Sequence, residues 1–312
     1  PACGPLPLTP IQRRFLAQDW AEPQHFNQAM LLELDPQTDP DTLETALRVL
    51  VDHHEALRTR FVRAADGQWQ ADIAAIDPAR PGAGLVLERA DFSALAEADW
   101  TDALRERTSA CQRGMDLGAG RLVRALWIER GPRRLLLLAI HHLVVDGVSW
   151  RVLLDDLPTA CDAVGRGAVP VLPARTLSFA DWAHQLQQDG PAAVADERAY
   201  WAGIAAGGVP ALPVDHMSGP DDHASADSVT TRLDPADTAA LLHQAPAAWQ
   251  TRINDLLLAA LLRAWQRWSG QRELLLSLEG HGREDVFDGR RDVDVSRTVG
   301  WFTALLDRKS TR

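Results

Sequence analysis

The stretch that decides the fold is LLLLAIHHLVVDG, from Leu135 to Gly147. Its first six residues, 135–140, are apolar and are typical of a buried strand, at the end of which His141 and His142 follow. Because strand side chains alternate between the two faces of a sheet, we expect these histidines to point to opposite sides. One can then face a cleft, where an imidazole can move protons near neutral pH, while the other is held inside the fold.

An Asp-Gly turn follows the histidine pair and leads into a predicted helix. Gly147 permits a sharp turn, and Ser149 can cap the helix. Asp146 can orient a histidine, or it can pair with a buried arginine and fix the loop, and we favour the structural role. Adjacent histidines are also common as purely structural residues. No metal site is expected at this pair, because two histidines on opposite faces do not easily bind one ion.

Helical and strand patterns alternate along the whole chain. The first helix has Thr9 as its candidate cap and Pro10 at its first position. Strands are predicted at 27–34, 57–62, 68–73, 121–129, 134–142, 228–233 and 273–278. Helices are predicted at 10–18, 41–54, 98–113, 148–164, 178–188, 195–204 and 253–268. This alternation predicts an α/β fold with a mixed sheet.

The composition excludes several classes of partner. The 312 residues are 46% hydrophobic and 24% charged, which is typical of a soluble globular protein with room for two lobes. The net charge of -11, without a Lys/Arg-rich block, argues against nucleic acid and anionic membranes as partners. The apolar runs are too short to cross a bilayer, and three cysteines without metal-ligand spacing fit a reducing cytoplasm. The Pro/Gly-rich residues 165–173 are the best candidate boundary between lobes.

A second candidate site is EGHGRE, Glu279–Glu284, directly after the predicted strand 273–278. Its two glycines let the backbone approach a ligand closely, and Glu279 is expected at the mouth of a cleft. A carboxylate in a partly apolar site has a raised proton affinity and can serve as acid or base. A surface turn would also explain this composition. Several tryptophans are expected in the core rather than against a cofactor, namely Trp150, Trp182, Trp201 and Trp301.

Four stretches carry a resemblance to a known family. HHLVVDG at 141–147 resembles the HHxxxDG signature of the condensation-domain superfamily of nonribosomal peptide synthetases. LTPIQRRF at 8–15, with HFNQ at 25–28, looks like the opening motif of the epimerization branch. EGHGRE and DVSRTVGWFT, the latter at 294–303, look like two motifs characteristic of epimerization domains. Condensation domains proper usually carry Asn in place of the Trp-Phe-Thr pattern. The resemblance covers essentially the whole chain, in the right order.

The resemblance implies a particular architecture. Family members have two lobes of chloramphenicol-acetyltransferase type, arranged in a V, each an α/β mixed-sheet sandwich, with the site in a tunnel between them. Residues 1–175 would form the N-terminal lobe with HHxxxDG. Residues 176–312 would form a linker and the first part of the C-terminal lobe, with EGHGRE and SRTVGWFT. Because family members continue past this point, the second lobe is expected to be incomplete.

The resemblance also implies an activity and its residues. The family's epimerization domains convert L to D at the α-carbon of an aminoacyl or peptidyl thioester, which is carried on the phosphopantetheine arm of a peptidyl carrier protein. We expect His142 on one wall of the site and Glu279 on the other to remove and return the α-proton, in either order. Alternatively, Glu279 and water move the protons while His142 stabilises the enolate. His141, Asp146 and Gly147 are assigned supporting roles. Either Arg283 or Arg58 is the candidate partner of Asp146.

Two other functions stay open. A condensation domain would form a peptide bond between two carrier-bound substrates and would not require a carboxylate opposite the histidine. An inactive, truncated remnant would only dock other proteins. No cofactor is expected on the domain itself, because pyridoxal phosphate needs a Schiff-base lysine and the only lysine is Lys309. Phosphopantetheine would come with the carrier protein, and the expected state is a monomeric domain among neighbouring synthetase domains in the cytoplasm, without a metal.

Overall fold

The computed structural model describes residues 2–206, 212–216, 218–220, 222–284 and 293–310. Its contacts divide it into two compact units. The first comprises Pro1–Ala195 and Glu279–Leu305, and the second comprises Asp196–Leu278 and Leu306–Arg312. Residues 176–195, which we expected in the linker and second lobe, belong to the first unit, and the lobe boundary itself stays a prediction. The candidate site discussed below lies within the first unit.

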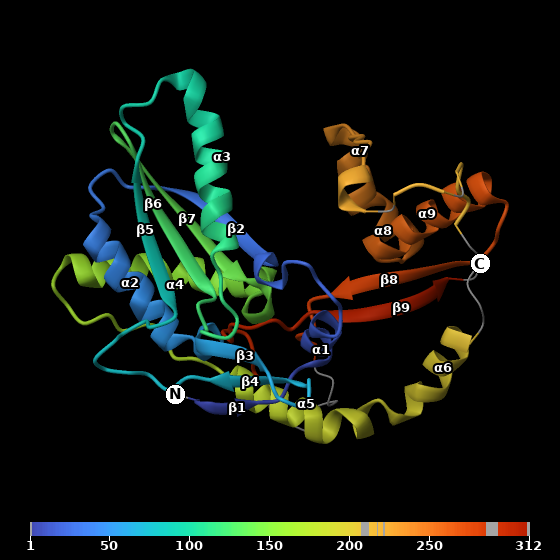
Figure 1. Cartoon of the computed structure of the whole chain (residues 1–312). Coiled ribbons are helices and arrows are strands. Elements are labelled where there is room, and N and C mark those ends of the chain that lie inside the picture. Colours follow the sequence, from blue (N-terminus) through green and yellow to red (C-terminus); the bar gives the residue numbers. More distant parts are fainter. Residues whose placement is uncertain (1, 207–211, 217, 221, 285–292, 311–312) are drawn as a thin grey trace. The chain divides into compact units, whose positions relative to one another are not determined.

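The elements follow one another as Figure 1 shows. The first unit holds the strands β1 (Gly4–Leu6), β2 (Asn27–Leu34), β3 (Thr59–Arg63), β4 (Trp69–Ile73), β5 (Leu85–Asp91), β6 (Val123–Arg130) and β7 (Arg133–His141). It also holds the helices α1 (Pro10–Leu16), α2 (Pro40–His53), α3 (Glu97–Arg113), α4 (Gly147–Gly165) and α5 (Phe179–Ala193). The second unit holds the helices α6 (Arg198–Ala206), α7 (Pro235–Ala239), α8 (Ala245–Trp249) and α9 (Ile253–Ser269). The paired strands β8 (Leu274–Gly280) and β9 (Ala304–Ser310) run from one unit into the other.

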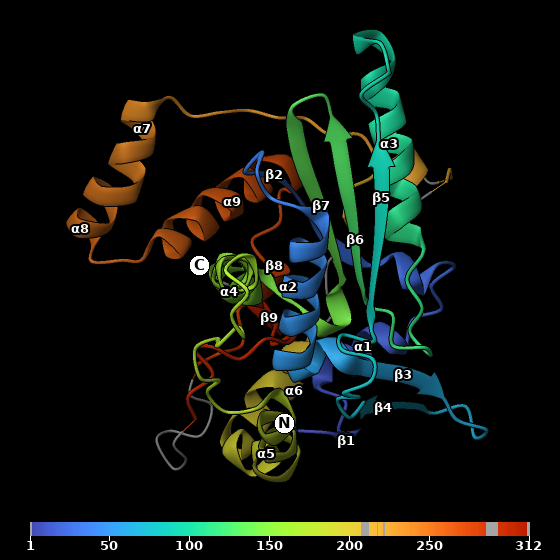
Figure 2. The ribbon, with the colours of Figure 1, turned by 90° about the vertical axis from the view of Figure 1, so that its left-hand side faces the viewer.

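The main sheet of the first unit has the order β2-β7-β6-β5. β2, β7 and β6 are antiparallel, whereas β5 runs parallel to β6 after the helical crossover through α3. Helices α2 and α4 pack together on one face of this sheet, and α3 covers the other (Figure 2). Helices on both faces of a mixed sheet confirm the predicted α/β class.

Strand β7 is buried on both faces, which explains its unbroken apolar sequence. Leu136, Leu138 and Ile140 belong to the main core, whereas Leu135 and Leu137 belong to a smaller cluster that includes side chains of α3. The strand alternation therefore continues up to His141, the last residue of the strand, whereas His142 lies beyond it.

A smaller sheet and the first helix complete the frame around the site. The smaller sheet has the order β1-β4-β3 and is antiparallel. Helix α1 begins as predicted, with Thr9 as the N-cap in a reciprocal capping box with Gln12 and with Pro10 at the first position. Helix α2 buries the apolar face that the sequence predicted, Leu43, Ala46, Leu47, Leu50 and Val51.

Three sequence predictions were wrong: they included one strand that is absent, left out one strand that is present, and placed one partly buried tryptophan in the core. Residues 228–233 form no strand, and their apolar members are exposed, with Val229 at 101%. β5 was not predicted, although it forms one edge of the main sheet. Trp201 is only partly buried and its indole donates to Glu197, whereas Trp150, Trp182 and Trp301 lie in the core as expected.

Among the described helices, none has the length and apolar character that a bilayer crossing needs.

Candidate active site

The two histidines of the HHxxxDG stretch stand where β7 ends. His141 is the last residue of the strand, and His142 begins a short 3-10 turn that ends at Val144. His141 is fully buried, with its Nε2 2.9 Å from the carbonyl oxygen of Pro23, and burial lowers the pKa of His141 to about 4. His141 is therefore a neutral part of the core.

His142 is half-buried and contacts two aromatic rings. The ring of Phe26 stacks on it at 4.9 Å between centroids and 12° between planes, and Trp301 lies at 4.7 Å on a tilted plane. His142 Nδ1 lies 2.8 Å from the carbonyl oxygen of Val145, and Nε2 lies 3.1 Å from the side-chain nitrogen of Gln28. These contacts fix the plane and the direction of the imidazole.

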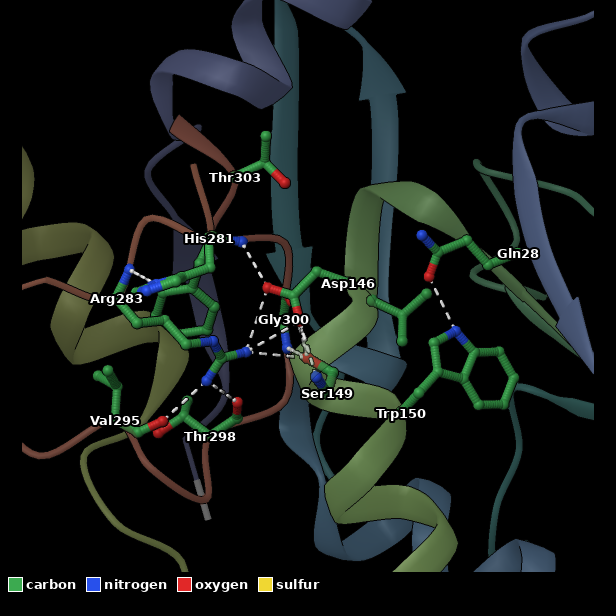
Figure 3. A network of polar contacts seen from close by, with 12 residues as sticks. Gln28, Asp146, Ser149, Trp150, His281, Arg283, Val295, Thr298, Gly300 and Thr303 are labelled. Atoms are coloured by element: carbon green, nitrogen blue, oxygen red, sulfur yellow. Dashed lines mark hydrogen bonds and ion pairs between the residues drawn. The ribbon is translucent and has the colours of Figure 1, made fainter. Parts of the chain in front are cut away.

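Asp146 anchors the loop and caps α4, a role that the sequence had suggested for Ser149 (Figure 3). Its Oδ1 accepts hydrogen bonds from the Ser149 backbone and hydroxyl, each at 2.7 Å. Its Oδ2 accepts from the backbone N–H of Phe302 at 3.2 Å. Gly147 is simply the first residue of α4. It has no positive φ, and a side chain there would meet nothing within 4 Å, so the conformation at this position does not require a glycine.

Arg283 joins the EGHGRE stretch to this anchor. Its Nη2 lies 3.0 Å from Asp146 Oδ1, and both side chains are only 7% exposed. Its Nη1 donates to the carbonyl oxygens of Val295 and Thr298, each at 2.8 Å. Burial lowers the pKa of the guanidinium, whereas the Asp146 carboxylate raises it. Because Arg283 bonds both to Asp146, the N-cap of α4, and to the carbonyl oxygens of Val295 and Thr298, it fixes the backbone of residues 295–298 against the start of α4.

Arg58, the other candidate partner, lies elsewhere. It is buried, and its guanidinium donates to the carbonyl oxygens of Ala74 and Ala2. It therefore ties the end of β4 to the N-terminal segment, and the structure places Arg283, not Arg58, beside Asp146.

The second glycine of EGHGRE is required by a close backbone approach. Gly282 has φ +65°, and a Cβ there would lie 1.8 Å from the carbonyl oxygen of Phe302. The Phe302 ring in turn packs under the guanidinium of Arg283 at 3.9 Å. Gly282 thus allows the EGHGRE loop and the segment Trp301–Thr303 to lie in direct contact.

Glu279 stands near the end of β8. It is exposed, not in the partly apolar surroundings that we expected, and its Oε1 accepts a hydrogen bond from the Thr303 hydroxyl at 3.2 Å. Thr303 is two residues from Trp301, which packs on His142. The segment Trp301–Thr303 therefore contacts both candidate catalytic residues, one at each end, while Phe302 between them faces Arg283.

One further cluster has the composition of a metal site. Ligand atoms of His53, His54 and Asp156 lie within 4.8 Å of one another, the only such group among the described residues. His54 Nε2 contacts Asp156 Oδ2 at 3.0 Å, and Arg297 Nη2 contacts Asp156 Oδ1 at 2.5 Å. A cation would have to compete with Arg297 for that carboxylate, so the cluster is better suited to joining α2, α4 and the 294–303 stretch.

Sequence reasoning missed the residues that orient His142. Gln28 was part of the quoted HFNQ stretch, and Trp150 follows the Asp-Gly turn directly, but neither was assigned to the site. Trp150 Nε1 donates to Gln28 Oε1 at 2.8 Å (Figure 3). The position of Gln28 within a motif was the available signal. Trp301 was assigned to the core, which is correct, but its packing on His142 was not foreseen.

Comparisons with known proteins agree on the family. The condensation-domain family model matches residues 4–310. Chondramide synthase cmdD of Chondromyces crocatus is 43% identical over 311 residues, which are 97% of this chain and 8% of that protein. The chain therefore spans less than a tenth of the length of this relative.

Two solved structures differ in how well they match. The epimerization domain from the third module of tyrocidine synthetase B is 32% identical with a TM-score of 0.88, and the match covers 99% of this chain and 69% of that chain. The first condensation domain of the calcium-dependent antibiotic synthetase is 22% identical with a TM-score of 0.70, over 99% of this chain and 69% of that chain. At 22% identity, the second match supports a shared fold only.

Proposed function

Because the chain belongs to the condensation-domain family, we propose that it acts in nonribosomal peptide synthesis as an epimerization domain. Its reaction would be the L-to-D inversion of an aminoacyl or peptidyl residue held as a thioester on a peptidyl carrier protein. The likeness to a solved epimerization domain, at 32% identity and a TM-score of 0.88, supports this choice over condensation. The EGHGRE and WFT stretches, which resemble motifs of epimerization domains, support it further.

The chemistry needs a base and an acid on opposite sides of one carbon. A thioester acidifies the neighbouring C–H, but a positioned base must still take the proton. The electron pair of the broken C–H bond moves onto the thioester oxygen as an enolate, while the C–S bond stays intact. A proton returned to the α-carbon from the opposite face completes the inversion, and exchange with water restores both groups.

The observation that carries the proposal is the segment Trp301–Thr303. Trp301 packs on His142, and Thr303 donates to Glu279, so one short segment contacts both an imidazole and a carboxylate. Imidazole and carboxylate are the side chains best suited to proton transfer near neutral pH. In this account His142 and Glu279 are the proton-transferring pair, and Asp146 with Arg283 holds the segment in place.

The partners follow from the reaction. The phosphopantetheine arm belongs to the carrier protein and brings the thioester to the domain, so the chain needs no soluble cofactor of its own for this step. Neighbouring domains of the synthetase would load and consume the substrate. The net charge of -11 makes nucleic acid a poor partner.

The test is α-proton exchange in heavy water. The full-length protein is given an L-aminoacyl carrier protein, and the released amino acid is analysed for deuterium and chirality. Epimerization predicts deuterium at the α-carbon and a mixture of L and D forms. Retained protium and pure L product, with a dipeptide formed when a second aminoacyl carrier is added, would mean condensation. Neither exchange nor dipeptide on several carriers would indicate a docking domain.

A further inference from the structure

The amide of Gln28 has a single possible orientation. Trp150 Nε1–H can only donate, and it lies 2.8 Å from one terminal atom of Gln28, which must therefore be the oxygen (Figure 3). Trp150 is 3% exposed and lies in the first turn of α4, so its indole is held firmly. The NH₂ group of Gln28 then faces His142 Nε2 at 3.1 Å.

The two nitrogens of His142 have partners with opposite requirements. An amide NH₂ can only donate, so Nε2 must accept with its lone pair. The Val145 carbonyl oxygen, 2.8 Å from Nδ1, can only accept, so Nδ1 must carry the proton. Two independent contacts thus assign the same form, a neutral imidazole protonated on Nδ1.

Three separate elements of the first unit build this arrangement. Gln28 lies on β2 opposite Ile140 of β7. The backbone N–H of His142 donates to the carbonyl oxygen of Phe26 at 2.9 Å, which extends the β2–β7 pairing to the site. Trp150 comes from α4. Phe26 stacks on one face of the imidazole and Trp301 packs beside it on a tilted plane, while both ring nitrogens make polar contacts.

We propose that Gln28, oriented by Trp150, is a positioning residue that fixes His142 as the Nδ1–H tautomer. Its catalytic consequence rests on the proposed function: Nε2 is the unprotonated nitrogen, and it takes the α-proton when the substrate C–H replaces the Gln28 N–H at its one lone pair. If the Gln28 amide turned over, its oxygen would instead accept from an Nε2–H. Trp150 prevents this turn, because its N–H would then meet the amide NH₂.

The measurement is the protonation of each His142 nitrogen, read from ¹⁵N shifts in the protein labelled with ¹⁵N-histidine. The His142 signals are identified by their loss in His142→Gln. The wild type is expected to show a protonated Nδ1 and an unprotonated Nε2. In Gln28→Glu, the carboxylate keeps the Trp150 contact but accepts from Nε2, so both nitrogens become protonated. In Trp150→Phe, the amide is free to turn and its oxygen can accept from Nε2, so part of the His142 population gains a proton on Nε2 while Val145 still holds the proton on Nδ1.

Controls separate this effect from general damage. Gln70→Glu places the same change at an exposed position of β4 and should leave the His142 signals unchanged. The signals of buried His141 report whether each variant is folded. An Nε2–H tautomer in the wild type, or unchanged His142 signals in folded Gln28→Glu and Trp150→Phe, would overturn the proposal.

Activity supplies a second readout that can fail separately. Gln28→Glu should slow α-proton exchange by about 100-fold or more, because a doubly protonated imidazole cannot accept a proton. If the tautomer pattern is found but the wild type exchanges no α-proton, the proposed function fails and the positioning role stands. If exchange occurs and Gln28→Glu leaves it unchanged, the positioning role fails and the function stands.

Discussion

His141 and His142 are neighbours in sequence but are held as opposite tautomers. His141 Nε2 donates to the carbonyl oxygen of Pro23, and its Nδ1 accepts from the N–H of Leu143 at 3.2 Å. His142 donates from Nδ1 to the carbonyl oxygen of Val145 instead. The same residue type thus serves the core at one position and leaves Nε2 unprotonated at the next, because the hydrogen bond made by one ring nitrogen determines the protonation of the other.

The buried histidine makes stability depend on pH. His141 has a pKa of about 4 in the fold against 6.5 for the free side chain, so the unfolded chain binds the proton more tightly. The free energy of unfolding should therefore fall by about 3 kcal/mol as the pH drops from 6.5 to 4. Burial also lowers the pKa of His53 to about 4, so His53 adds to the pH dependence. The wild type is therefore compared with His141→Gln, which keeps the contribution of His53. Denaturant unfolding at several pH values in this range should show a smaller change of the free energy of unfolding with pH in the variant than in the wild type. An equal change in both would contradict a lowered pKa for His141.

The Asp146–Arg283 pair is expected to stabilise the fold. Asp146→Ala leaves a buried guanidinium unpaired and should lower the free energy of unfolding by about 3–5 kcal/mol. The matched control is Asp72→Ala, which removes the exposed Arg60–Asp72 pair and should cost less than about 1 kcal/mol. Urea unfolding measures both, and equal losses in the two variants would show that Asp146 does not anchor the loop.

Gly282 should tolerate no side chain. Both Gly282 and Gly131 have positive φ, +65° and +55°, but a Cβ at Gly131 meets nothing within 4 Å, whereas one at Gly282 meets the Phe302 carbonyl. Gly131→Ala should cost about 1–2 kcal/mol from backbone strain alone. Gly282→Ala should cost clearly more and should also reduce activity, because it displaces the segment that contacts His142 and Glu279. A cost for Gly282→Ala no larger than that for Gly131→Ala would refute this role.

Much of the fold follows from local patterns. The apolar face of α2, the cap at Thr9 and the continuous apolar run of β7 each identify an element without knowledge of its partners. β5 was missed because only Leu85 is buried in it and the strand follows a Pro/Gly-rich segment. Residues 228–233 were wrongly predicted as a strand, because β-forming side chains need a partner strand and a face to bury.

The site was predictable only in part. The motifs pointed to His142, Glu279 and Arg283 as candidates, but they did not show which side chains contact them. Gln28 and His142 are 114 positions apart, and Trp150 and Gln28 are 122 apart, so their contacts arise only from the β2–β7 pairing and the packing of α4. The choice between Arg283 and Arg58 likewise needed the fold.

The central claim is that His142 and Glu279 act on opposite faces of one carbon. The most direct measurement follows loss of the α-proton in heavy water from L- and from D-aminoacyl carrier protein separately. It uses the full-length wild type, His142→Gln and Glu279→Gln, with His25→Gln and Glu284→Gln as exposed controls. We predict that His142→Gln and Glu279→Gln both lose inversion. Each variant retains α-proton loss from at most one enantiomer, and that enantiomer differs between the two variants. Inversion at wild-type rate in either variant would contradict the account.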